Sequence, residues 1–420
     1  MHAIDGLFRA CARAGLGVVL ASLMCIAETS PATRSWPTAP PRIRVVGIDG
    51  VSQEGMWGGM TANDLAIRTE AGDARISADD LTLVIFVDAA TATRSSARTP
   101  GETICMLADG GILHGVLAEH DDGGIRLARS SLGDLSLRLA DLAALRLDAG
   151  TDNAKAQAEM DRWLARRPAG HDVLVVVRDG SVTAVRAAVL AVGPDGGRFS
   201  YADRTLTFRR DTVYGIVFGG AAAAPAAPRF ALTLGDGSRI AAAITRADEQ
   251  TIHLMLSQRY PAAVRVDQVR QIDVRSERVT FASDMQPVEA VFEPYLDTPW
   301  PHRRDRSVAN RPIRLGGVEY AKGLGVHSRS DIAFALDGKY TRFAATIGID
   351  DFVRPRGHVV FRVLADGREV FRSGPVTGRD EPRAVLVDVT GARQVRLIVE
   401  FGEEFDVADH ADWAHARFIR

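Results

Sequence analysis

The sequence predicts a mainly β protein, in which tandem small barrels of the SH3-like or Sm-like type precede an antiparallel β-sandwich. Three observations support this prediction. Short apolar runs with alternating patterning are separated by Asp-Gly and Thr-Gly turns, an acidic phrase recurs four times in the same order, and one internal segment alone has helical composition. Alternation sends every second side chain to the same face, which suits strands with one buried face.

Residues 1–27 have the features of an export signal. Arg9 and Arg13 precede the apolar stretch Gly15–Ile26, and Ala27 offers a cleavage point. The apolar stretch is shorter than the ~20 residues of a membrane-spanning helix. We therefore expect a secreted, periplasmic or cell-envelope protein without a membrane span once the signal is cleaved; the alternative is an uncleaved anchor.

Two segments rich in Pro and small residues divide the remainder of the chain. Residues 28–42 are expected to form an extended tether, and residues 221–228, an Ala/Pro run, a linker. Such compositions bury little surface and favour extended connections.

Four β-repeats are predicted, two within residues 43–150, one within 171–220 and one within 229–278. Each ends in an apolar strand, an acidic turn and another apolar strand; the four phrases are Ile76–Leu81, Leu139–Leu142, Phe208–Val213 and Val266–Val269. Units of this size bury little core alone, so neighbouring units should pack together.

The acidic residues of these phrases recur at equivalent turn positions; they are Asp79, Asp80, Asp141, Asp211 and Asp267. Recurrence indicates a shared structural role, because an Asp side chain can accept a hydrogen bond from its own backbone two residues on. Residues 151–170 break the β pattern. Their Ala, Glu, Lys and Arg content and the stop at Pro168-Ala169-Gly170 predict a helix inserted between the second and third repeats.

The C-terminal part, residues 285–420, contains four further alternating runs; they are Ile332–Leu336, Arg342–Ile349, Val359–Leu364 and Val395–Phe401. Asp-Gly and Thr-Gly turns separate them. Runs of this length and patterning, rich in Val, Ile and Phe, predict an antiparallel β-sandwich.

Ordered motifs give this part a resemblance to a known family. They are Gly323–Ser328 (GLGVHS), Asp350-Asp351, Ala365-Asp366-Gly367 with Val370–Ser373, Val387–Ala392 and the final Asp409–Ala414 (DHADWA). The series resembles the NPCBM family of carbohydrate-binding modules. The resemblance implies a galactose-binding-like jelly roll that binds a glycan or polysaccharide, often attached to glycoside hydrolases. The segment Tyr295–Ser307 is more basic than the family pattern, which counts against sugar contacts there.

A candidate sugar site follows from the closing motif and the glycine-rich one. Sugar sites combine an aromatic platform with polar side chains that pair with hydroxyl groups. Trp413 could supply the platform, and Asp409, His410, Asp412 and His327 the polar fringe. The alternative is that Trp413 fills the sandwich core, that the two Asp residues fix the turn before the last strand, and that His327 pairs with one of the acids.

Acidic residues near this motif suggest a metal. Asp350, Asp351 and Asp406, with Glu403 and Glu404, offer the hard oxygen ligands that Ca²⁺ prefers. The resemblance adds support, since folds of the galactose-binding type often hold a structural Ca²⁺. The alternative is a solvated acidic loop, and no other cofactor is indicated.

Several function classes are disfavoured. The formal net charge is -2, and no basic cluster with interleaved aromatics indicates nucleic-acid binding. GxSxG, HExxH, P-loop and CxxC motifs are absent from the sequence, and a glycosidase needs a carboxylate pair in a cleft. We expect a secreted non-catalytic carbohydrate-binding protein whose repeats act as spacer or docking surface. The alternatives are a cell-envelope structural or protein-interaction protein with a degenerate sugar module, bound to an envelope protein, and a glycoside hydrolase-associated enzyme.

Overall fold

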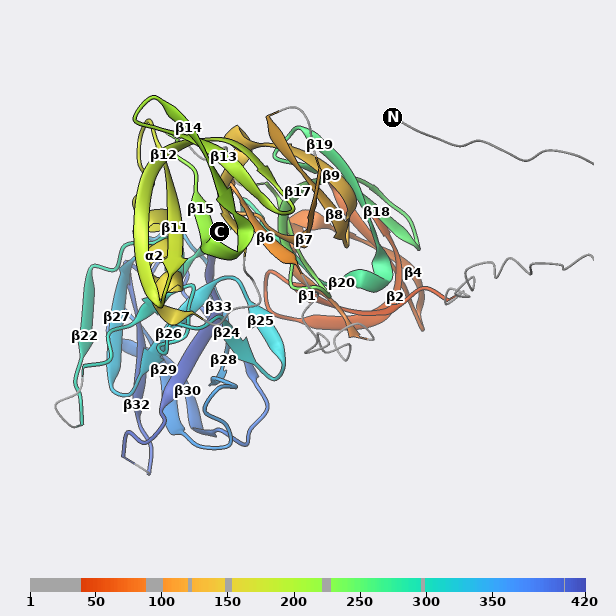
Figure 1. Cartoon of the computed structure of the whole chain (residues 1–420). Helices are drawn as coiled ribbons and strands as arrows, with labels where there is room; N and C mark the ends of the chain where they lie inside the picture. The colour runs from red at the N-terminus through yellow and green to blue at the C-terminus, as the bar shows by residue number, and fades with distance from the viewer. Residues whose placement is uncertain are drawn as a thin grey trace, which may run out of the picture. The chain divides into compact units, whose positions relative to one another are not determined.

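The computed structural model describes residues 39–87, 101–119, 123–147, 153–220, 228–295, 299–403 and 405–420, and within them the protein is mainly β (Figure 1). The predicted signal peptide, residues 28–38 of the predicted tether and residues 221–227 of the predicted linker lie outside the described residues. No helix in the described ranges has the length and apolar character needed to cross a membrane.

Four successive units of five strands occupy the region of the predicted repeats. The first contains β1 (Arg42–Gly47), β2 (Ser52–Met60), β3 (Asp64–Thr69), β4 (Gly72–Ser77) and β5 (Leu81–Phe86). The second contains β6 (Glu102–Leu107), β7 (Ile112–Ala118), β8 (Gly124–Ser130), β9 (Gly133–Arg138) and β10 (Leu142–Arg146). The third contains β11 (Asp172–Arg178), β12 (Ser181–Gly193), β13 (Gly196–Tyr201), β14 (Arg204–Arg209) and β15 (Val213–Val217). The fourth contains β16 (Phe230–Leu234), β17 (Arg239–Ala247), β18 (Thr251–Leu256), β19 (Tyr260–Arg265) and β20 (Val269–Val274).

The units have the same strand pairing. The first four strands of each unit form antiparallel pairs in chain order, as β1, β2, β3 and β4 do. The fifth strand of each unit pairs with its first, as β5 does with β1 and β20 with β16. Fifth strands also pair between units, β5 with β20 and β10 with β15, so that all of these strands belong to one 20-stranded sheet. A single apolar cluster contains residues of all four units. The structure therefore does not confirm separate closed barrels, because neighbouring units share both sheet and core.

A short 3-10 turn precedes the fifth strand of each unit and contains the recurring acidic residues. Three of their carboxylates accept hydrogen bonds from the arginine that precedes the turn, in the pairs Arg138–Asp141, Arg209–Asp211 and Arg265–Asp267. In the first unit the side chain that caps the turn is Ser77, which accepts from the Asp79 amide at 3.3 Å. The acidic residues thus form ion pairs in place of the expected bonds to their own backbone.

A helix, α2 (Ala154–Ala165), lies between the second and third units. It begins where the Asn153 side chain accepts a hydrogen bond from the Ala156 amide at 3.0 Å, which satisfies one of the unpaired N–H groups of the first turn. Ala156 and Met160 are fully buried against Val173 and Tyr214 of the third unit. This apolar face explains why the segment departs from the β pattern.

The C-terminal part forms a β-sandwich of two antiparallel sheets. One sheet contains β23 (Arg303–Arg304), β26 (Gly323–His327), β33 (His410–Ile419), β28 (Arg342–Ile349) and β31 (Arg383–Asp388), in that order, with β21 (Val279–Phe281) beside β33. The other contains β22 (Glu289–Phe292), β27 (Ser330–Ala335), β32 (Gln394–Phe401), β29 (His358–Ala365) and β30 (Arg368–Thr377). A separate hairpin is formed by β24 (Ile313–Leu315) and β25 (Val318–Tyr320).

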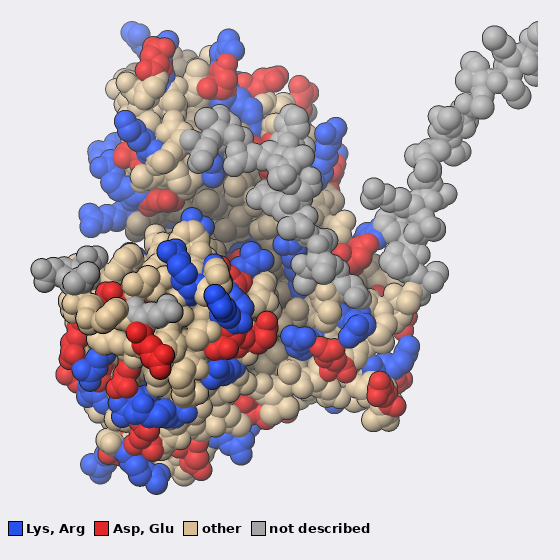
Figure 2. Space-filling model, turned by 90° about the horizontal axis from the view of Figure 1, so that it is seen from below, with Lys and Arg blue, Asp and Glu red and all other residues tan. Residues whose placement is uncertain are grey.

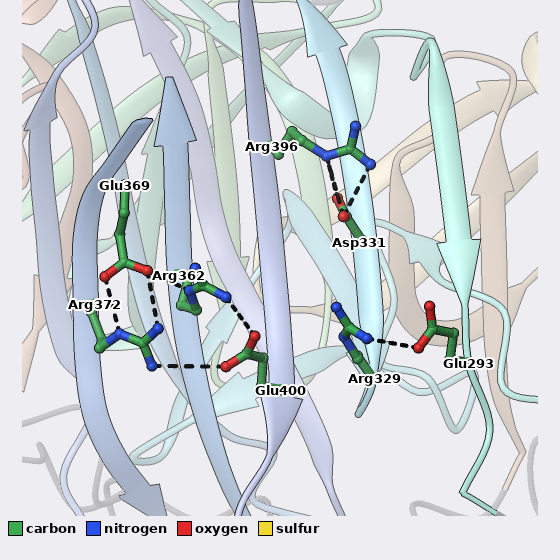
Figure 3. A network of polar contacts seen from close by, with 8 residues as sticks. All are labelled: Glu293, Arg329, Asp331, Arg362, Glu369, Arg372, Arg396 and Glu400. Carbon is green, nitrogen blue, oxygen red and sulfur yellow. Dashed lines mark hydrogen bonds and ion pairs between the residues drawn. The ribbon is translucent and has the colours of Figure 1, made fainter. Parts of the chain in front are cut away.

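The inner faces of the two sheets meet in an apolar core that includes Phe343, Phe361 and Trp413. The outer face of the second sheet instead carries a ladder of ion pairs, in which Arg396 binds Asp331 and Arg362 binds Glu400 across neighbouring strands (Figure 3). Apolar side chains inside and paired charges outside are the arrangement that the alternating sequence pattern predicts. Acidic and basic side chains are likewise interspersed over the face drawn in Figure 2.

Candidate functional site

One end of the sandwich brings the predicted residues His327 and His410 together. His327 is the last residue of β26, His410 is the first of β33, and the two are directly opposite in the antiparallel register. Their ring centroids are 5.6 Å apart, and the ring planes are inclined at 63°. His410 is half-buried, whereas His327 is only 3% exposed. We call this end of the sandwich the histidine rim.

Trp300 covers the imidazole of His327. The two rings are stacked, with centroids 5.3 Å apart and an interplanar angle of 10°, and the Trp300 ring also lies 5.4 Å from that of His410. Trp300 belongs to the segment Tyr295–Ser307, which the sequence placed outside the sugar site. The sequence does contain a signal for Trp300, which lies between Pro299 and Pro301. Prolines on both sides indicate an irregular segment, and an aromatic residue there does not belong to the buried face of a strand or helix.

Two exposed aromatic rings extend the histidine rim. Tyr295 is 50% exposed and Phe405 is 58% exposed, and their ring centroids are 5.0 Å apart. Tyr295 also contacts Phe401 edge-on at 5.6 Å. Exposed aromatic rings that contact one another form an apolar surface that water solvates poorly, which is typical of a binding surface.

An exposed ion pair lies close in sequence to Tyr295. The Arg329 guanidinium donates a hydrogen bond to Glu293 at 2.8 Å, and both side chains are exposed (Figure 3). The backbones of the two residues are also paired, with the Glu293 amide 2.9 Å from the Arg329 carbonyl oxygen. Glu293 is two residues from Tyr295, so the pair places charged donors and acceptors in the same segment as an exposed aromatic ring.

The two histidines are neutral at neutral pH. Burial, followed by the nearby imidazole of His327, lowers the pKa of His410 to about 4. Burial likewise lowers the pKa of His327, whose Nδ1–H donates to the Ser328 carbonyl oxygen at 3.0 Å. A neutral imidazole keeps one donor and one acceptor, so it can hydrogen-bond a hydroxyl group in either direction. The Nδ1 atom of His410 is buried and has no hydrogen-bond partner among the described residues.

The sequence of the sandwich is similar to a known domain. Residues 278–419 match the NPCBM/NEW2 domain. The match confirms the resemblance that the ordered motifs indicate.

Two curated relatives are similar to part of this chain. One, from Renibacterium salmoninarum, is named as an endo-alpha-N-acetylgalactosaminidase; it is 35% identical over 150 residues, which are 33% of this chain and 9% of the relative. The other is alpha-1,3-galactosidase B of Akkermansia muciniphila, 34% identical over 116 residues, which are 26% of this chain and 14% of the relative. The chain thus spans a small part of the length of both.

Solved structures also resemble part of this chain. CBM51 from Clostridium perfringens GH95, in complex with methyl-galactose, is 26% identical, with 33% of this chain and 99% of that chain covered and a TM-score of 0.31. The CBM51-2 and INT domains from Clostridium perfringens ZmpB, in complex with GlcNAc, are 27% identical, with 40% of this chain and 36% of that chain covered and a TM-score of 0.32.

Trp413 does not offer a platform at the surface of the NPCBM domain. It is fully buried, and its ring meets Phe361 edge-on at 4.9 Å and Phe343 at 6.0 Å. Trp413 lies on the inner face of β33, so its side chain points into the sandwich core. The predicted platform role is therefore corrected to the alternative, a core anchor.

Asp409 is also fully buried and joins three segments of the histidine rim. Its carboxylate accepts from the Ser328 hydroxyl at 2.5 Å and from the His358 amide at 2.9 Å. His358 Nδ1 in turn accepts from the Glu403 amide at 2.6 Å. Burial raises the pKa of Asp409 to about 6, in opposition to these hydrogen bonds. Asp409 thus faces the protein interior and fixes the loops.

Asp412 lies on the outer face of β33, where neither solvent nor a sugar can reach it. It is fully buried, and its neighbours on the adjacent strands are both glycines, Gly325 and Gly348. Burial, together with the carboxyl group of Asp350, raises the pKa of Asp412 well above its usual value. Of the five predicted site residues, His410 alone remains partly accessible.

The predicted calcium ligands are not brought together. Asp350 accepts from the Arg314 and Phe352 amides, and Asp351 from the Gly316 and Gly317 amides, so both carboxylates bind backbone N–H groups. Asp406 instead lies near Asp409 and His327. The described residues contain no group of three or more His, Cys, Asp or Glu side chains arranged to hold a metal ion. Glu404 lies outside the described residues.

Proposed function

We propose that this chain binds a glycan through the histidine rim of its NPCBM domain. The observation that carries the proposal is the match of residues 278–419 to that domain, at whose rim Tyr295 and Phe405 leave half or more of their surface exposed. The proposed contact surface comprises Tyr295, Trp300, Phe405 and His410, with the Arg329–Glu293 pair at its border.

The chemistry of the rim suits a sugar. A pyranose ring has an apolar face of C–H groups that packs on aromatic rings, and its hydroxyl groups need donors and acceptors at the edge of that contact. Tyr295 and Phe405 would supply the ring faces. The neutral His410 and the Arg329–Glu293 pair would supply the donors and acceptors, while Trp300 and the buried His327 hold the rim in shape.

The names of the relatives suggest which sugars to test first. One is named for the release of alpha-linked N-acetylgalactosamine and the other for the release of alpha-1,3-linked galactose. A binding module attached to such an enzyme gains by binding the same kind of glycan, since binding raises the local concentration of substrate. We therefore propose terminal alpha-galactosyl and alpha-N-acetylgalactosaminyl groups as ligands.

We further propose that the chain is not itself a catalyst. Asp366 and Asp388 line a hollow of about 660 Å³ at the opposite end of the sandwich, yet both accept hydrogen bonds from backbone amides. The bond from the Thr390 amide lowers the pKa of Asp388, whereas the general acid of a glycosidase requires a raised one. We also propose export to the periplasm, cell envelope or exterior. The repeat units would act as a spacer or docking surface, and their closure into separate barrels stays a prediction.

A second candidate is a structural or protein-interaction role in the cell envelope. The burial of Asp409, Asp412 and Trp413 favours it, because the residues of the closing motif hold the fold and leave little for a ligand. The two candidates differ in what the exposed aromatic rings of the rim do. Glycan binding that depends on Tyr295 supports the first and counts against the second.

Isothermal titration of the full chain with methyl alpha-galactoside and methyl alpha-N-acetylgalactosaminide tests the proposal. We expect millimolar or tighter binding, equivalent to about −4 kcal/mol or more. Binding should weaken at least ~10-fold in Tyr295→Ala, since burial of a large apolar side chain is worth about 1.5–3 kcal/mol. Tyr201→Ala is the matched control, because Tyr201 is 52% exposed and lies in the third repeat unit. Absence of binding at millimolar sugar, or equal binding by both variants, would contradict the proposal. Release of p-nitrophenol from the p-nitrophenyl glycosides would contradict the non-catalytic assignment.

A further inference from the structure

The third repeat unit differs from the other three in the exposure of its β13–β14 hairpin (Figure 1). The fourth strand has six residues in every unit and ends at the residue before the 3-10 turn, so the four strands align without a gap. The third position of this strand is Leu135 in the second unit, which is 5% exposed, and alanine in the first and fourth units, where Ala74 and Ala262 pack against the shared core. In the third unit it is Leu206, which is 42% exposed.

The neighbouring strand, β13, shows the same difference. Phe199 is directly opposite Leu206, and Tyr201 lies two residues further along β13, so the three side chains share one face of the hairpin. The fourth unit has Leu256 at the position of Tyr201; Leu256 is fully buried, whereas Tyr201 is 52% exposed. Phe199 packs against the shared core, so the exposed part of this face is held by a buried part. We call Phe199, Tyr201 and Leu206 the third-unit face.

The first unit shows a hairpin that is suited to solvent at the same place. Thr69 stands where the third unit has Tyr201, and Ala74 stands where it has Leu206. No residue of β3 or β4 is a large apolar side chain exposed to solvent. The terminal units of a repeat array need a polar outer face to stay soluble. The first unit has such a face at this hairpin, and the third unit does not.

The second and fourth units show how this repeat covers its fourth strand. Strands β9 and β19 contact each other, and the amide of Arg138, the last residue of β9, donates at 3.2 Å to the hydroxyl of Tyr260, the first residue of β19. Tyr260 also donates to Asp141 in the turn after β9, and Arg259 lies 3.7 Å from the same carboxylate. Asp141 thus binds Arg138 of its own unit and two side chains of the fourth unit.

The two ends of β14 carry the charges that a contact of this kind uses. Arg209, the last residue of β14, donates to Asp211 in the following turn at 2.6 Å, as Arg138 does to Asp141. The Asp211 side chain is 60% exposed, so a second donor can reach it. Arg204, the first residue of β14, is exposed and forms no ion pair with any residue that the structure describes. An unpaired cation at one end and an accessible carboxylate at the other make β14 complementary to a second copy of itself.

We propose that two copies of the chain associate through the third-unit face, with their β14 strands antiparallel about a two-fold axis. In this arrangement Leu206 lies near the axis, and Arg204 of each copy pairs with Asp211 of the other, as the fourth unit does with Asp141. A second copy fits this face because one strand supplies both an apolar cover and the carboxylate that Arg204 requires. The contact involves the repeat units alone, so it is independent of glycan binding.

Sedimentation velocity of the full chain at micromolar concentration measures this association. We expect a reversible dimer whose dissociation constant rises at least ~10-fold in Leu206→Asp, because a carboxylate near the axis would lose its hydration in the contact. Leu386→Asp is the matched control, since Leu386 is also 42% exposed but lies on β31 of the NPCBM domain, and it should dimerise as the wild type does. A monomeric wild type, or equal dissociation constants for the two variants, would overturn the proposal.

Exchange of charges tests the orientation of the two strands without altering the apolar face. Arg204→Asp and Asp211→Arg should each be monomeric alone, because like charges then meet at both ends of the contact. An equimolar mixture of these two variants should form a heterodimer, since opposite charges then meet at both ends. A mixture that stays monomeric, or single variants that dimerise as well as the wild type, would contradict the antiparallel contact.

Discussion

Asp412 shows how far the role of a single residue depends on burial. Its carboxyl group lies fully buried on the outer face of β33 and next to Asp350, which is only 1% exposed. Two ionised carboxylates cannot share such a site without a large electrostatic cost, so Asp412 retains its proton well above the pH at which an exposed Asp loses it. A residue type that usually marks the surface is here a neutral interior group.

Replacing Asp412 with Asn should therefore make the stability of the fold less sensitive to a rise in pH from 5 to 8. The folded-state pKa of Asp412 is raised, so the native chain keeps a proton that the unfolded chain releases near pH ~3.9, and the native state loses stability as pH rises from that value towards the folded pKa. Asp412→Asn removes this loss. We expect its melting temperature relative to the wild type to rise between pH 5 and pH 8, by thermal unfolding followed with circular dichroism.

Asp388→Asn is the control for that experiment. The pKa of Asp388 is lowered by the hydrogen bond from the Thr390 amide, so its contribution has the opposite sign and is present above the unfolded pKa. This variant should lose stability at both pH values. A difference between Asp412→Asn and the wild type that does not change with pH would show that Asp412 is ionised in the folded protein.

At the scale of elements, the loops of the histidine rim depend on one carboxylate. Asp409 receives hydrogen bonds from Ser328, which follows β26, and from His358, which begins β29. His358 in turn accepts from the Glu403 amide in the loop after β32. The strands that end at this rim therefore have a common anchor below the surface that carries Tyr295 and Phe405.

Removing that anchor should loosen the rim without unfolding the sandwich. Asp409→Ala leaves the Ser328 hydroxyl and the His358 amide without an acceptor, at a cost of about 1–3 kcal/mol. We expect faster amide hydrogen exchange at His358 and Glu403, together with weaker glycan binding. Asp406→Ala is the control, since Asp406 is close by and half-buried. Unchanged exchange at His358 in Asp409→Ala would refute the anchoring role, whether or not the chain binds a sugar.

Element prediction from the sequence succeeded where one face of a strand is solvated. The runs at Val359–Leu364 and Val395–Phe401 coincide with β29 and β32 almost to the residue, because alternation reports directly which side chains face the core. The last strand, β33, has no such contrast. The β24–β25 hairpin covers its outer face at Ala414, and the core covers its inner face at Trp413. Its polar residues therefore looked like a binding fringe although most of them are buried.

At the scale of the whole molecule, the sequence indicated four repeats but not how they combine. Each repeated phrase lies within a unit, so local pattern is sufficient to find it. The pairing of β5 with β20 joins Val84 to Ile272, and no local pattern records a contact between strands so far apart in the chain. The same limit hid Trp300, whose partners His327 and His410 come from strands that the sequence does not link to it.

Arg417 joins the NPCBM domain to the first repeat unit. Its side chain is 1% exposed; Nε donates to the Ile48 carbonyl oxygen at 2.7 Å, and Nη2 to that of Gly47 at 3.1 Å. Burial lowers the pKa of Arg417 to about 10, so the guanidinium stays charged at neutral pH and needs these acceptors.

Arg417→Met keeps the apolar stem and removes the guanidinium hydrogen bonds to the Ile48, His415 and Gly47 carbonyl oxygens. We expect a loss of about 2–4 kcal/mol in urea unfolding and a separation of the transitions of the repeats and the NPCBM domain, because the two parts no longer share this bond. Arg393→Met, at an exposed arginine of the same domain, should unfold as the wild type does. If Arg417→Met and Arg393→Met unfold at the same urea concentration, the two parts are independent and the repeats act as a spacer alone.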